Sequence, residues 1–244
     1  MEGNLSTAIM LAGGEGTRLR PLTYDIPKPL VKVNGKPLLE YAIEELERNG
    51  IKHIVVSTGY KADKVIDYLT ARTNKRSECK IDYIIEEKLL RTGGAIRYAM
   101  NAIKNAEDFA VVYADTIFKV DMQGMYRLHR SQHSMATIGI ANVEDVSGFG
   151  VVNVEGDKIS SFVEKPDPSK CASHVINAGI YLLSSGISNF FPQKDAFSLE
   201  SEVFQTGLGK IAMFAYKLDE FITINTLEQL NAAEKALNSR KIKH

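Results

Sequence analysis

Short β-type runs alternate with amphipathic helical stretches over the first half of this chain, and this alternation restricts the fold more than any other feature. An apolar run at residues 7–11 predicts the first strand, and residues 37–49 predict a helix with one apolar face that ends at Gly50. Parallel strands need helical crossovers, so this series predicts a doubly wound α/β fold. The series continues with strands at residues 53–57, 81–85 and 109–113 and helices at residues 62–70 and 95–103.

After about residue 134 the pattern changes to short strands broken by turn residues, which indicates an antiparallel extension of the same sheet. These strands are predicted at residues 136–141, 150–154, 159–163 and 177–183, with a closing strand at 221–224 and a helix at 227–237. No linker or repeat separates the two halves, so one domain over 1–244 is expected. Its parts are a first lobe at about 1–133, a second lobe at about 134–225 and a C-terminal helix at about 226–240.

Composition restricts the partners. Lys plus Arg and Asp plus Glu each number 30, and this balance argues against nucleic-acid binding, which needs a basic excess. The two cysteines, Cys79 and Cys171, show neither metal-ligand nor redox-pair spacing. No signal-like or membrane-length apolar run occurs, so we expect a cytoplasmic protein without a membrane partner. The sequence leaves homo-oligomer formation open.

The segment from Leu11 to Thr23, which follows the first predicted strand, carries the strongest chemical signal. Its glycines let backbone N–H groups approach a polyphosphate, and Arg18 adds a fork of donors. It is neither a dinucleotide fingerprint nor a P-loop, since both need residues that are missing. A tight strand-to-helix turn is the alternative interpretation. Lys28, held between Pro27 and Pro29, favours a phosphate site over that alternative.

Together, Leu-Ala-Gly-Gly-Glu-Gly-Thr-Arg-Leu-Arg-Pro-Leu-Thr, Pro-Lys-Pro-Leu and Gly-Lys-Pro-Leu-Leu-Glu-Tyr resemble the sugar-1-phosphate nucleotidyltransferase family, almost to the C-terminus. The resemblance implies a Rossmann-like three-layer α/β/α sandwich with a mostly parallel mixed sheet. It also implies transfer of a nucleotidyl group from a nucleoside triphosphate to a sugar 1-phosphate, with Mg²⁺ as cofactor and pyrophosphate as the second product. The first lobe would bind the nucleotide, and the second the sugar phosphate.

The resemblance assigns the nucleotide and its phosphates to residues of the first lobe. The loop at residues 87–95 resembles the family's base-binding loop, with Arg91 where glycine is usual; its guanidinium either stacks near the base or projects into solvent. The implied nucleotide-binding residues are Leu11, Ala12, Gly13, Gly14, Gly16, Thr17, Arg18, Lys28, Thr92, Gly93 and Gly94.

Asp115 follows a strand of buried appearance, where open α/β sheets bind their ligands, and the family has a metal-binding aspartate there. The alternative is a turn or helix-capping aspartate. Ala114 replaces the family's usual glycine. In the final motif Thr223 stands where many members have a second metal-binding aspartate. Asn225, on the same face of the strand, is predicted to replace it, and the alternative is that Asn225 caps the last helix.

The second lobe carries segments that resemble the family's sugar site. In the Glu-Lys-Pro motif the carboxylate would accept hydrogen bonds from sugar hydroxyls and the lysine would bind the sugar phosphate, although an adjacent Glu and Lys are ordinarily a solvated pair. The implied sugar-phosphate residues are Gly150, Glu164, Lys165, Asn177 and Gly179.

A phosphate monoester has a second pKa of about 6, so the acceptor needs no catalytic base at neutral pH. Catalysis would instead depend on fixed cations, namely Arg18, Lys28, Lys165 and a metal on Asp115. The segment from Phe197 to Glu200 resembles guanylyltransferases for mannose- or heptose-type 1-phosphates. Uridylyl-, thymidylyl- and cytidylyltransferases share nearly the same skeleton, so another base is an open alternative. Phosphocholine is an alternative acceptor. A catalytically silent regulatory homologue is the alternative from a different class.

Overall fold

The computed structural model describes residues 4–73 and 78–241. The strands are β1 Thr7–Leu11, β2 Lys32–Val33, β3 Lys36–Pro37, β4 His53–Thr58, β5 Lys80–Ile85, β6 Asp108–Tyr113, β7 Thr116–Lys119, β8 Ala136–Asn142, β9 Gly150–Glu155, β10 Lys158–Glu164, β11 Val175–Ser184, β12 Met213–Lys217 and β13 Glu220–Thr223. The helices are α1 Leu22–Asp25, α2 Leu38–Arg48, α3 Ala62–Thr73, α4 Arg91–Met100, α5 Met122–Ser131 and α6 Leu227–Lys241, with short helical turns η1 Thr17–Leu19, η2 Lys28–Leu30, η3 Pro168–Lys170, η4 Ser185–Phe190 and η5 Glu200–Phe204.

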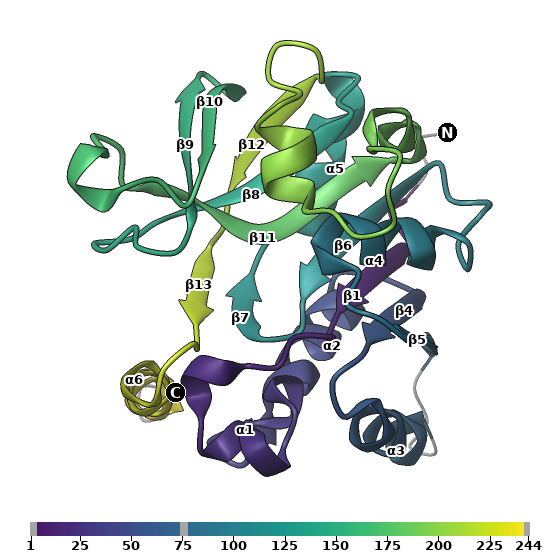
Figure 1. Cartoon of the computed structure of the whole chain (residues 1–244), viewed down its shortest axis with the longest axis vertical. Helices are drawn as coiled ribbons and strands as arrows, with labels where there is room; N and C mark the ends of the chain where they lie inside the picture. Colours follow the sequence, from purple (N-terminus) through teal and green to yellow (C-terminus); the bar gives the residue numbers. More distant parts are fainter. Residues whose placement is uncertain (1–3, 74–77, 242–244) are drawn as a thin grey trace.

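One mixed sheet runs through both predicted lobes, with the strand order β5-β4-β1-β6-β11-β8-β12-β10-β9 (Figure 1). The predicted parallel series is confirmed, since β5, β4, β1 and β6 pair in parallel. Within the described residues, β10 and β11 run opposite to the other strands of this sheet, which agree in direction. The sheet is therefore mostly parallel and mixed, as predicted.

The side chains of β1 show how helices come to cover both faces of the sheet. Ile9 and Leu11 pack into a core that includes α4 and η5, whereas Ala8 and Met10 pack into a second core that includes α2, α3 and α5. Successive strand residues point to opposite faces, so a strand that is apolar throughout needs cover on both sides. The result is the predicted three-layer α/β/α arrangement.

The second half extends the sheet, but not everywhere as predicted. β12, which the sequence pattern did not predict, pairs with β8 in parallel rather than antiparallel. The predicted closing strand is β13, which pairs with β7 in a separate two-stranded ribbon. The unpredicted helix α5 begins where Asp121 accepts a hydrogen bond from the Gly124 N–H, and it has a short buried face. Three buried side chains at helical spacing are too weak a signal for prediction from sequence.

Helix α4 begins at Arg91, so the prediction of a loop as far as residue 95 is wrong for its last part. The N–H groups of Gly93 and Gly94 both donate to the carbonyl oxygen of Phe197, at 2.9 and 3.2 Å. A Cβ on either glycine would overlap residues 195–197, so the two glycines let the first turn of α4 pack directly on that segment.

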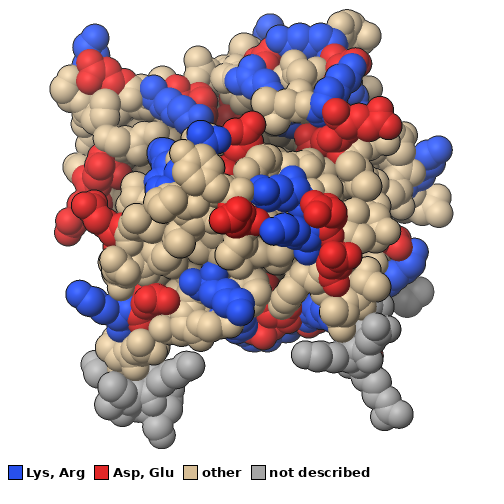
Figure 2. Space-filling view, turned by 60° about the horizontal axis from the view of Figure 1, so that its bottom comes forward, with Lys and Arg blue, Asp and Glu red and all other residues tan. Residues whose placement is uncertain are grey.

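Acidic and basic side chains are interspersed over the face in Figure 2, in keeping with the balanced composition. No helix within residues 4–73 and 78–241 is long and apolar enough to cross a membrane.

Candidate active site

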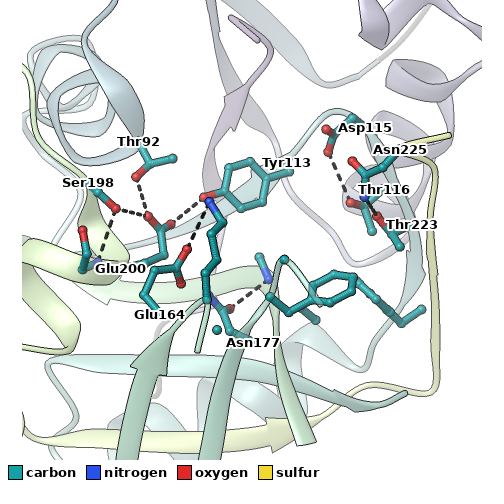
Figure 3. A pocket seen from close by; sticks show the side chains of 18 of the residues that line it. Thr92, Tyr113, Asp115, Thr116, Glu164, Asn177, Ser198, Glu200, Thr223 and Asn225 are labelled. Atoms are coloured by element: carbon teal, nitrogen blue, oxygen red, sulfur yellow. Dashed lines mark hydrogen bonds and ion pairs between the residues drawn. The ribbon is translucent and has the colours of Figure 1, made fainter. Parts of the chain in front are cut away.

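A pocket of about 600 Å³ brings together most of the charged residues singled out in the sequence (Figure 3). It opens beyond the carboxyl end of β6, where β6 and β11 lie side by side. Open α/β sheets bind their ligands at this kind of edge. The lining residues are Arg18, Arg91, Thr92, Tyr113, Asp115, Thr116, Gly148, Phe149, Gly150, Glu164, Lys165, Asn177, Ala178, Gly179, Ser198, Glu200, Ser201, Phe221, Thr223 and Asn225.

Four residues from distant segments form the phosphate-side cluster, which we define as Arg18, Lys28, Asp115 and Asn225. Lys28 Nζ donates to Asp115 Oδ2 at 2.5 Å and to Asn225 Oδ1 at 2.8 Å. Arg18 Nη2 donates to the same Asn225 oxygen at 3.1 Å. The Lys28 side chain is only 9% exposed, and these partners offset the cost of burying it. The structure thus brings together four of the residues that the sequence assigned to phosphate and metal binding.

Asn225 does not cap the last helix. The N–H of Gln229 bonds to the hydroxyl of Thr226, and the Gln229 side chain accepts from the Asn225 N–H. Thr226 therefore supplies the cap of α6. The Asn225 amide group is held by Thr223, whose hydroxyl accepts from Nδ2 at 2.8 Å, and this contact directs Oδ1 toward Lys28.

Of the predicted nucleotide-binding loop, only Arg18 lines the pocket, and Gly16 lies against the side chain of Lys28. Leu11 ends β1, and the Ala12 N–H donates to the Ser57 carbonyl oxygen. Gly14 faces open space, and Gly16 has a left-handed φ of +63° that turns the chain into η1, which begins at Thr17. Gly93 and Gly94 serve helix packing in this structure, and a role for them in nucleotide binding stays a prediction.

Sequence reasoning missed Glu86, which follows β5 at the same edge of the sheet. Its Oε1 accepts from the Ser57 hydroxyl at 2.8 Å, and its Oε2 accepts from the Leu90 N–H at 3.3 Å. A Cβ on Gly13 would overlap Oε1, so the carboxylate lies against the glycine-rich loop. Burial raises the pKa of Glu86 above the ordinary value of 4.5. Glu86 does not line the first pocket but a second cavity of about 620 Å³, which extends along α4 from Gly94 to Asn101.

On the opposite side of the pocket, the predicted sugar residues are brought together on β9, β10 and β11. Gly150 pairs with Glu164 across the β9–β10 hairpin, and a Cβ on Gly150 would overlap Glu164 Oε2. That oxygen is buried, and within the described residues it has no hydrogen-bond partner. Burial and then the charge of Glu200 raise the pKa of Glu164. Lys165 Nζ lies 3.4 Å from Glu164 Oε1 and remains 65% exposed.

Asn177 presents a single donor to the pocket. Its Oδ1 accepts from the Gly179 N–H at 3.0 Å, and its Nδ2 donates to the Tyr181 hydroxyl at 2.8 Å. One amide hydrogen remains. Gly179 has a φ of +72° and lies against the ring of Tyr113, where any side chain would overlap the ring. Glycine is required at this position for both reasons.

Glu200 is the centre of a hydroxyl cluster, which we define as Glu200, Thr92, Tyr113, Tyr181 and Ser198, and which was not predicted as a site. All four hydroxyls donate to its carboxylate: Tyr113 at 2.5 Å and Tyr181 at 3.1 Å to Oε1, and Thr92 at 2.6 Å and Ser198 at 2.7 Å to Oε2. In Figure 3, the ring of Tyr113 lies between the other labelled residues of this cluster and the phosphate-side residues Asp115 and Asn225. The sequence signals were Thr92, which was predicted to bind the nucleotide, and the segment Phe197 to Glu200.

Arg91 lies at the rim of the pocket with a left-handed φ of +60°. This conformation explains why glycine suits the position. Its guanidinium is 54% exposed and donates to Glu202 Oε1 at 3.3 Å. Glu202 also pairs with Lys194 and accepts from the Ser198 N–H.

Residues 7–217 match the sequence model of the nucleotidyl transferase family, and the chain belongs to that family.

Among its relatives, the chain is 36% identical over 215 residues to the D-glycero-alpha-D-manno-heptose 1-phosphate guanylyltransferase of Campylobacter jejuni, a match that covers 88% of this chain and 91% of the relative. It is 37% identical over 181 residues to the bifunctional protein GlmU of Methanococcus maripaludis, covering 74% of this chain. It is 33% identical to mannose-1-phosphate guanyltransferase beta-B of Xenopus laevis, covering 88% of this chain. The aligned parts span only 40% and 59% of the last two relatives.

Solved structures agree with this placement. HddC from Yersinia pseudotuberculosis superposes with a TM-score of 0.78 at 34% identity, covering 96% of this chain and all of the other. The same protein has been solved in complex with GMP-PN, with a TM-score of 0.77. A UDP-glucose pyrophosphorylase complexed with UDP-glucose has a TM-score of 0.80 at 24% identity, covering 97% of this chain and 99% of that one, and this likeness shows the fold alone.

Proposed function

We propose that this chain transfers a nucleotidyl group from a nucleoside triphosphate to a sugar 1-phosphate, with release of pyrophosphate. The observation that carries this proposal is one pocket that has two chemically different ends. Arg18 and Asn225 lie at one end, and the unpartnered Glu164 oxygen and the Asn177 amide lie at the other. Fixed cations suit phosphoryl groups, whereas a neutral donor and an acceptor suit sugar hydroxyls.

Nucleotidyl transfer requires two polyanions to meet in line, and the residues of this chain supply the compensating charge. Arg18 and Lys28 would bind the triphosphate, and Lys165 would bind the phosphate of the sugar. The acceptor phosphate is largely ionised at neutral pH because its second pKa is about 6, so it attacks without a protein base. Positioning and electrostatic stabilisation of the α-phosphoryl group are then sufficient.

The residues present fit a Mg²⁺ ion between Asp115 and Asn225. An ammonium, Lys28 Nζ, already lies within 2.5 Å of an Asp115 oxygen and 2.8 Å of the Asn225 amide oxygen, so both oxygens point at one cation position. Mg²⁺ needs only one or two protein oxygens beside water and substrate phosphates. When bound there, the ion would neutralise charge on the phosphates. Asn225→Asp should retain substantial activity, because it keeps an oxygen in place, whereas Asn225→Ala should raise the Mg²⁺ requirement and Thr223→Ala should be mild.

We propose guanosine triphosphate as the preferred donor, and Glu86 as the residue that supports it. A carboxylate has about four acceptor positions, and Ser57 and Leu90 use one on each oxygen, so each oxygen retains another. Guanine presents two adjacent donors, N1–H and N2–H, that match two carboxylate oxygens. Uracil and thymine present one ring N–H beside an acceptor, which a carboxylate matches poorly. Mannose- or heptose-type 1-phosphates are the corresponding acceptors, since relatives with these names match this chain.

The test is pyrophosphate release from a panel of nucleoside triphosphates against a panel of sugar 1-phosphates and phosphocholine, with Mg²⁺. The proposal expects turnover that is highest with GTP and a hexose or heptose 1-phosphate. Turnover with another base would overturn the guanine assignment alone. A folded protein that binds nucleotide but never turns over would favour the silent regulatory homologue.

A paired substitution isolates the base. Glu86→Gln should lower kcat/KM for GTP by about tenfold or more, because the amide replaces an acceptor by a donor opposite a guanine N–H. The same amide should improve uridine or thymidine triphosphate relative to GTP. Glu155→Gln is the control, since Glu155 is an exposed glutamate of the β9–β10 hairpin that lines neither cavity. Equal effects of the two substitutions would remove Glu86 from base recognition.

A further inference from the structure

The carboxylate of Glu200 is buried, with 6% of the residue exposed, and it receives hydrogens from four hydroxyl groups. An ionised carboxylate can only accept, so each of these hydroxyls must donate to it. Burial and the charge of Glu200 raise the pKa of both Tyr113 and Tyr181 well above the ordinary tyrosine value. Both phenols therefore keep their hydrogens over the physiological pH range, and the direction of every hydrogen bond in the cluster is fixed.

This fixed direction decides what the pocket offers to a ligand. Tyr113 lines the pocket, and because its hydrogen is committed to Glu200, its oxygen can only accept from anything bound there. Thr92 also donates to Glu200, and its oxygen accepts from the Leu199 N–H at 2.9 Å, so it has no hydrogen left to donate and retains one acceptor position. Tyr181 lies beneath the surface and accepts from Asn177.

Glu164 completes an acceptor wall, which we define as Tyr113 Oη and Glu164 Oε2. The second atom is buried, lacks a hydrogen-bond partner within the described residues, and belongs to a residue on the pocket wall. A buried carboxylate oxygen without a hydrogen-bond partner destabilises the protein unless a ligand supplies a donor. Figure 3 shows the Glu164 and Glu200 side chains next to one another, on the same side of the pocket as the hydroxyl of Tyr113.

We propose that Glu200 is a positioning residue that makes this wall acceptor-only, so that the pocket selects a sugar carrying a free hydroxyl donor where it meets Tyr113 and Glu164. This inference rests on the proposed function and adds a specificity rule to it. Glu200 acts through Tyr113 and need not touch the substrate. Sugars that are deoxygenated or capped at that hydroxyl are the ones it excludes.

The experiment uses the preferred sugar 1-phosphate together with its monodeoxy and deoxyfluoro analogues. Fluorine can accept weakly but cannot donate, so an acceptor wall must reject the deoxyfluoro analogue as strongly as the deoxy analogue. We expect at least one ring position where both analogues lose about tenfold or more in kcat/KM, while KM for the nucleoside triphosphate is unchanged. Clear rescue by fluorine at every sensitive position would show a donating wall and overturn the proposal.

Two variants connect this rule to Glu200. Tyr113→Phe removes one acceptor of the wall, and Glu200→Gln places an amide donor where two hydroxyls donate, which releases hydroxyl hydrogens toward the pocket. We define the deoxy penalty as the loss in kcat/KM when the deoxy analogue replaces the parent sugar 1-phosphate. Both variants should reduce this penalty at the sensitive position severalfold, mainly through KM for the sugar. Tyr181→Phe is the matched control, because it removes a phenol that donates to the same Glu200 oxygen but does not line the pocket. It should retain the penalty.

The outcomes separate the possible failures. If wild-type protein transfers to no sugar 1-phosphate, the proposed function fails and this rule fails with it. If wild-type protein transfers but Tyr113→Phe and Glu200→Gln keep the full deoxy penalty, only the present inference fails. A Glu200→Gln protein with a lower thermal unfolding midpoint, normal sugar KM and an unchanged penalty would show that Glu200 has a structural role alone.

Discussion

Lys28 and Glu200 are both buried charges beside the same pocket, and their surroundings differ in kind. Lys28 is held by Asp115 and Asn225, the two groups that the proposed function assigns to a metal ion. Glu200 is held by hydrogen bonds from four hydroxyl groups. None of these four groups is assigned to a metal ion by the proposed function. On the proposed function, substrate and metal would have to rearrange the phosphate-side cluster, whereas the hydroxyl cluster would keep its arrangement while a sugar binds.

The difference follows from what each end has to do. A triphosphate would bring several negative charges together with a metal ion. The charged groups of the phosphate-side cluster pair with each other in its absence, and each could exchange its partner for a phosphate or the metal. A sugar brings only hydroxyls, whose discrimination depends on preset directions of donation and acceptance. One end is built for exchange of ionic partners and the other for a fixed pattern of hydrogen bonds.

Removing the carboxylate charge of the phosphate-side cluster should have the largest effect. Asp115→Asn is expected to lower kcat by about a thousandfold, because the amide weakens the proposed metal site and leaves the buried Lys28 without its counter-ion. The measurement is pyrophosphate release over a Mg²⁺ titration, beside thermal unfolding. Asp157→Asn, in the exposed β9–β10 turn, is the control. Near-normal turnover would show that Asp115 is not a metal ligand. The contrast drawn here between the two ends of the pocket would then fail.

Separating the two lysines should give the next largest effect. Lys28→Ala is expected to lower kcat/KM by about a hundredfold through the triphosphate, and Lys165→Ala by about tenfold through the sugar phosphate, since Lys165 is much more exposed. Steady-state kinetics with each substrate varied in turn will distinguish them. Lys170→Ala, a nearby lysine whose side chain is 81% exposed, should behave as wild type. Both variants acting on one substrate would contradict the division of the pocket.

The two ends also differ in how far the sequence predicted them. Arg18 and Lys28 lie ten positions apart in a glycine- and proline-rich stretch, and Asp115 follows a recognisable strand, so local pattern and family resemblance located them. The hydroxyl cluster joins residues 92, 113, 181, 198 and 200, which lie on separate elements and are of common types. Only the packing of α4, β6, β11 and η5 brings them together, and no local pattern encodes that packing.

Glu86 illustrates the same limit at the level of one residue. In sequence it belongs to Glu86-Glu87-Lys88, which reads as a solvated charged turn. Its contacts with Ser57 and Leu90 distinguish it from Glu87, and those contacts depend on the register of β4 against β5. The main strand series, by contrast, follows from apolar periodicity, which is local, and was predicted to within two residues at each end. Elements with short buried faces, such as α5, were missed for want of that signal.

A pH dependence of base selection should be a smaller effect. Burial raises the pKa of Glu86 above 4.5, so on acidification it takes up a proton before an ordinary glutamate does. A protonated carboxyl loses one acceptor, and the advantage of guanine's second donor goes with it. We expect the ratio of kcat/KM for GTP to that for inosine triphosphate, which lacks the N2 amine, to fall severalfold as the pH drops from neutrality toward this raised pKa.

Taking the ratio of the two kcat/KM values cancels the titration of the triphosphate group, because GTP and inosine triphosphate share that group. In Glu86→Gln, which has no titrating group at this position, the ratio should stay flat with pH. A wild-type ratio that does not change with pH, or a Gln variant that follows the wild-type curve, would show that Glu86 does not read the base.

Arg91 lies at the rim of the pocket, beside Thr92 of the hydroxyl cluster, and substitution there should have the smallest effect. A non-glycine residue at φ +60° is strained by about 1–2 kcal/mol, and the exposed ion pair with Glu202 returns at most about 1 kcal/mol. Lys194 and the Ser198 N–H keep Glu202 paired once Arg91 is gone.

Arg91→Gly and Arg91→Ala remove the same guanidinium, but only glycine relieves the backbone. The glycine variant should therefore be more stable than the alanine variant by about 0.5–1 kcal/mol in denaturant unfolding, after the entropy of glycine in the unfolded chain is subtracted. If both variants lose the same activity, the guanidinium contacts a substrate; if both keep it, Arg91 serves only the rim. A glycine variant that is less stable than the alanine variant by about 0.5–1 kcal/mol, the entropy cost of glycine alone, would show that the left-handed conformation at this position carries no strain.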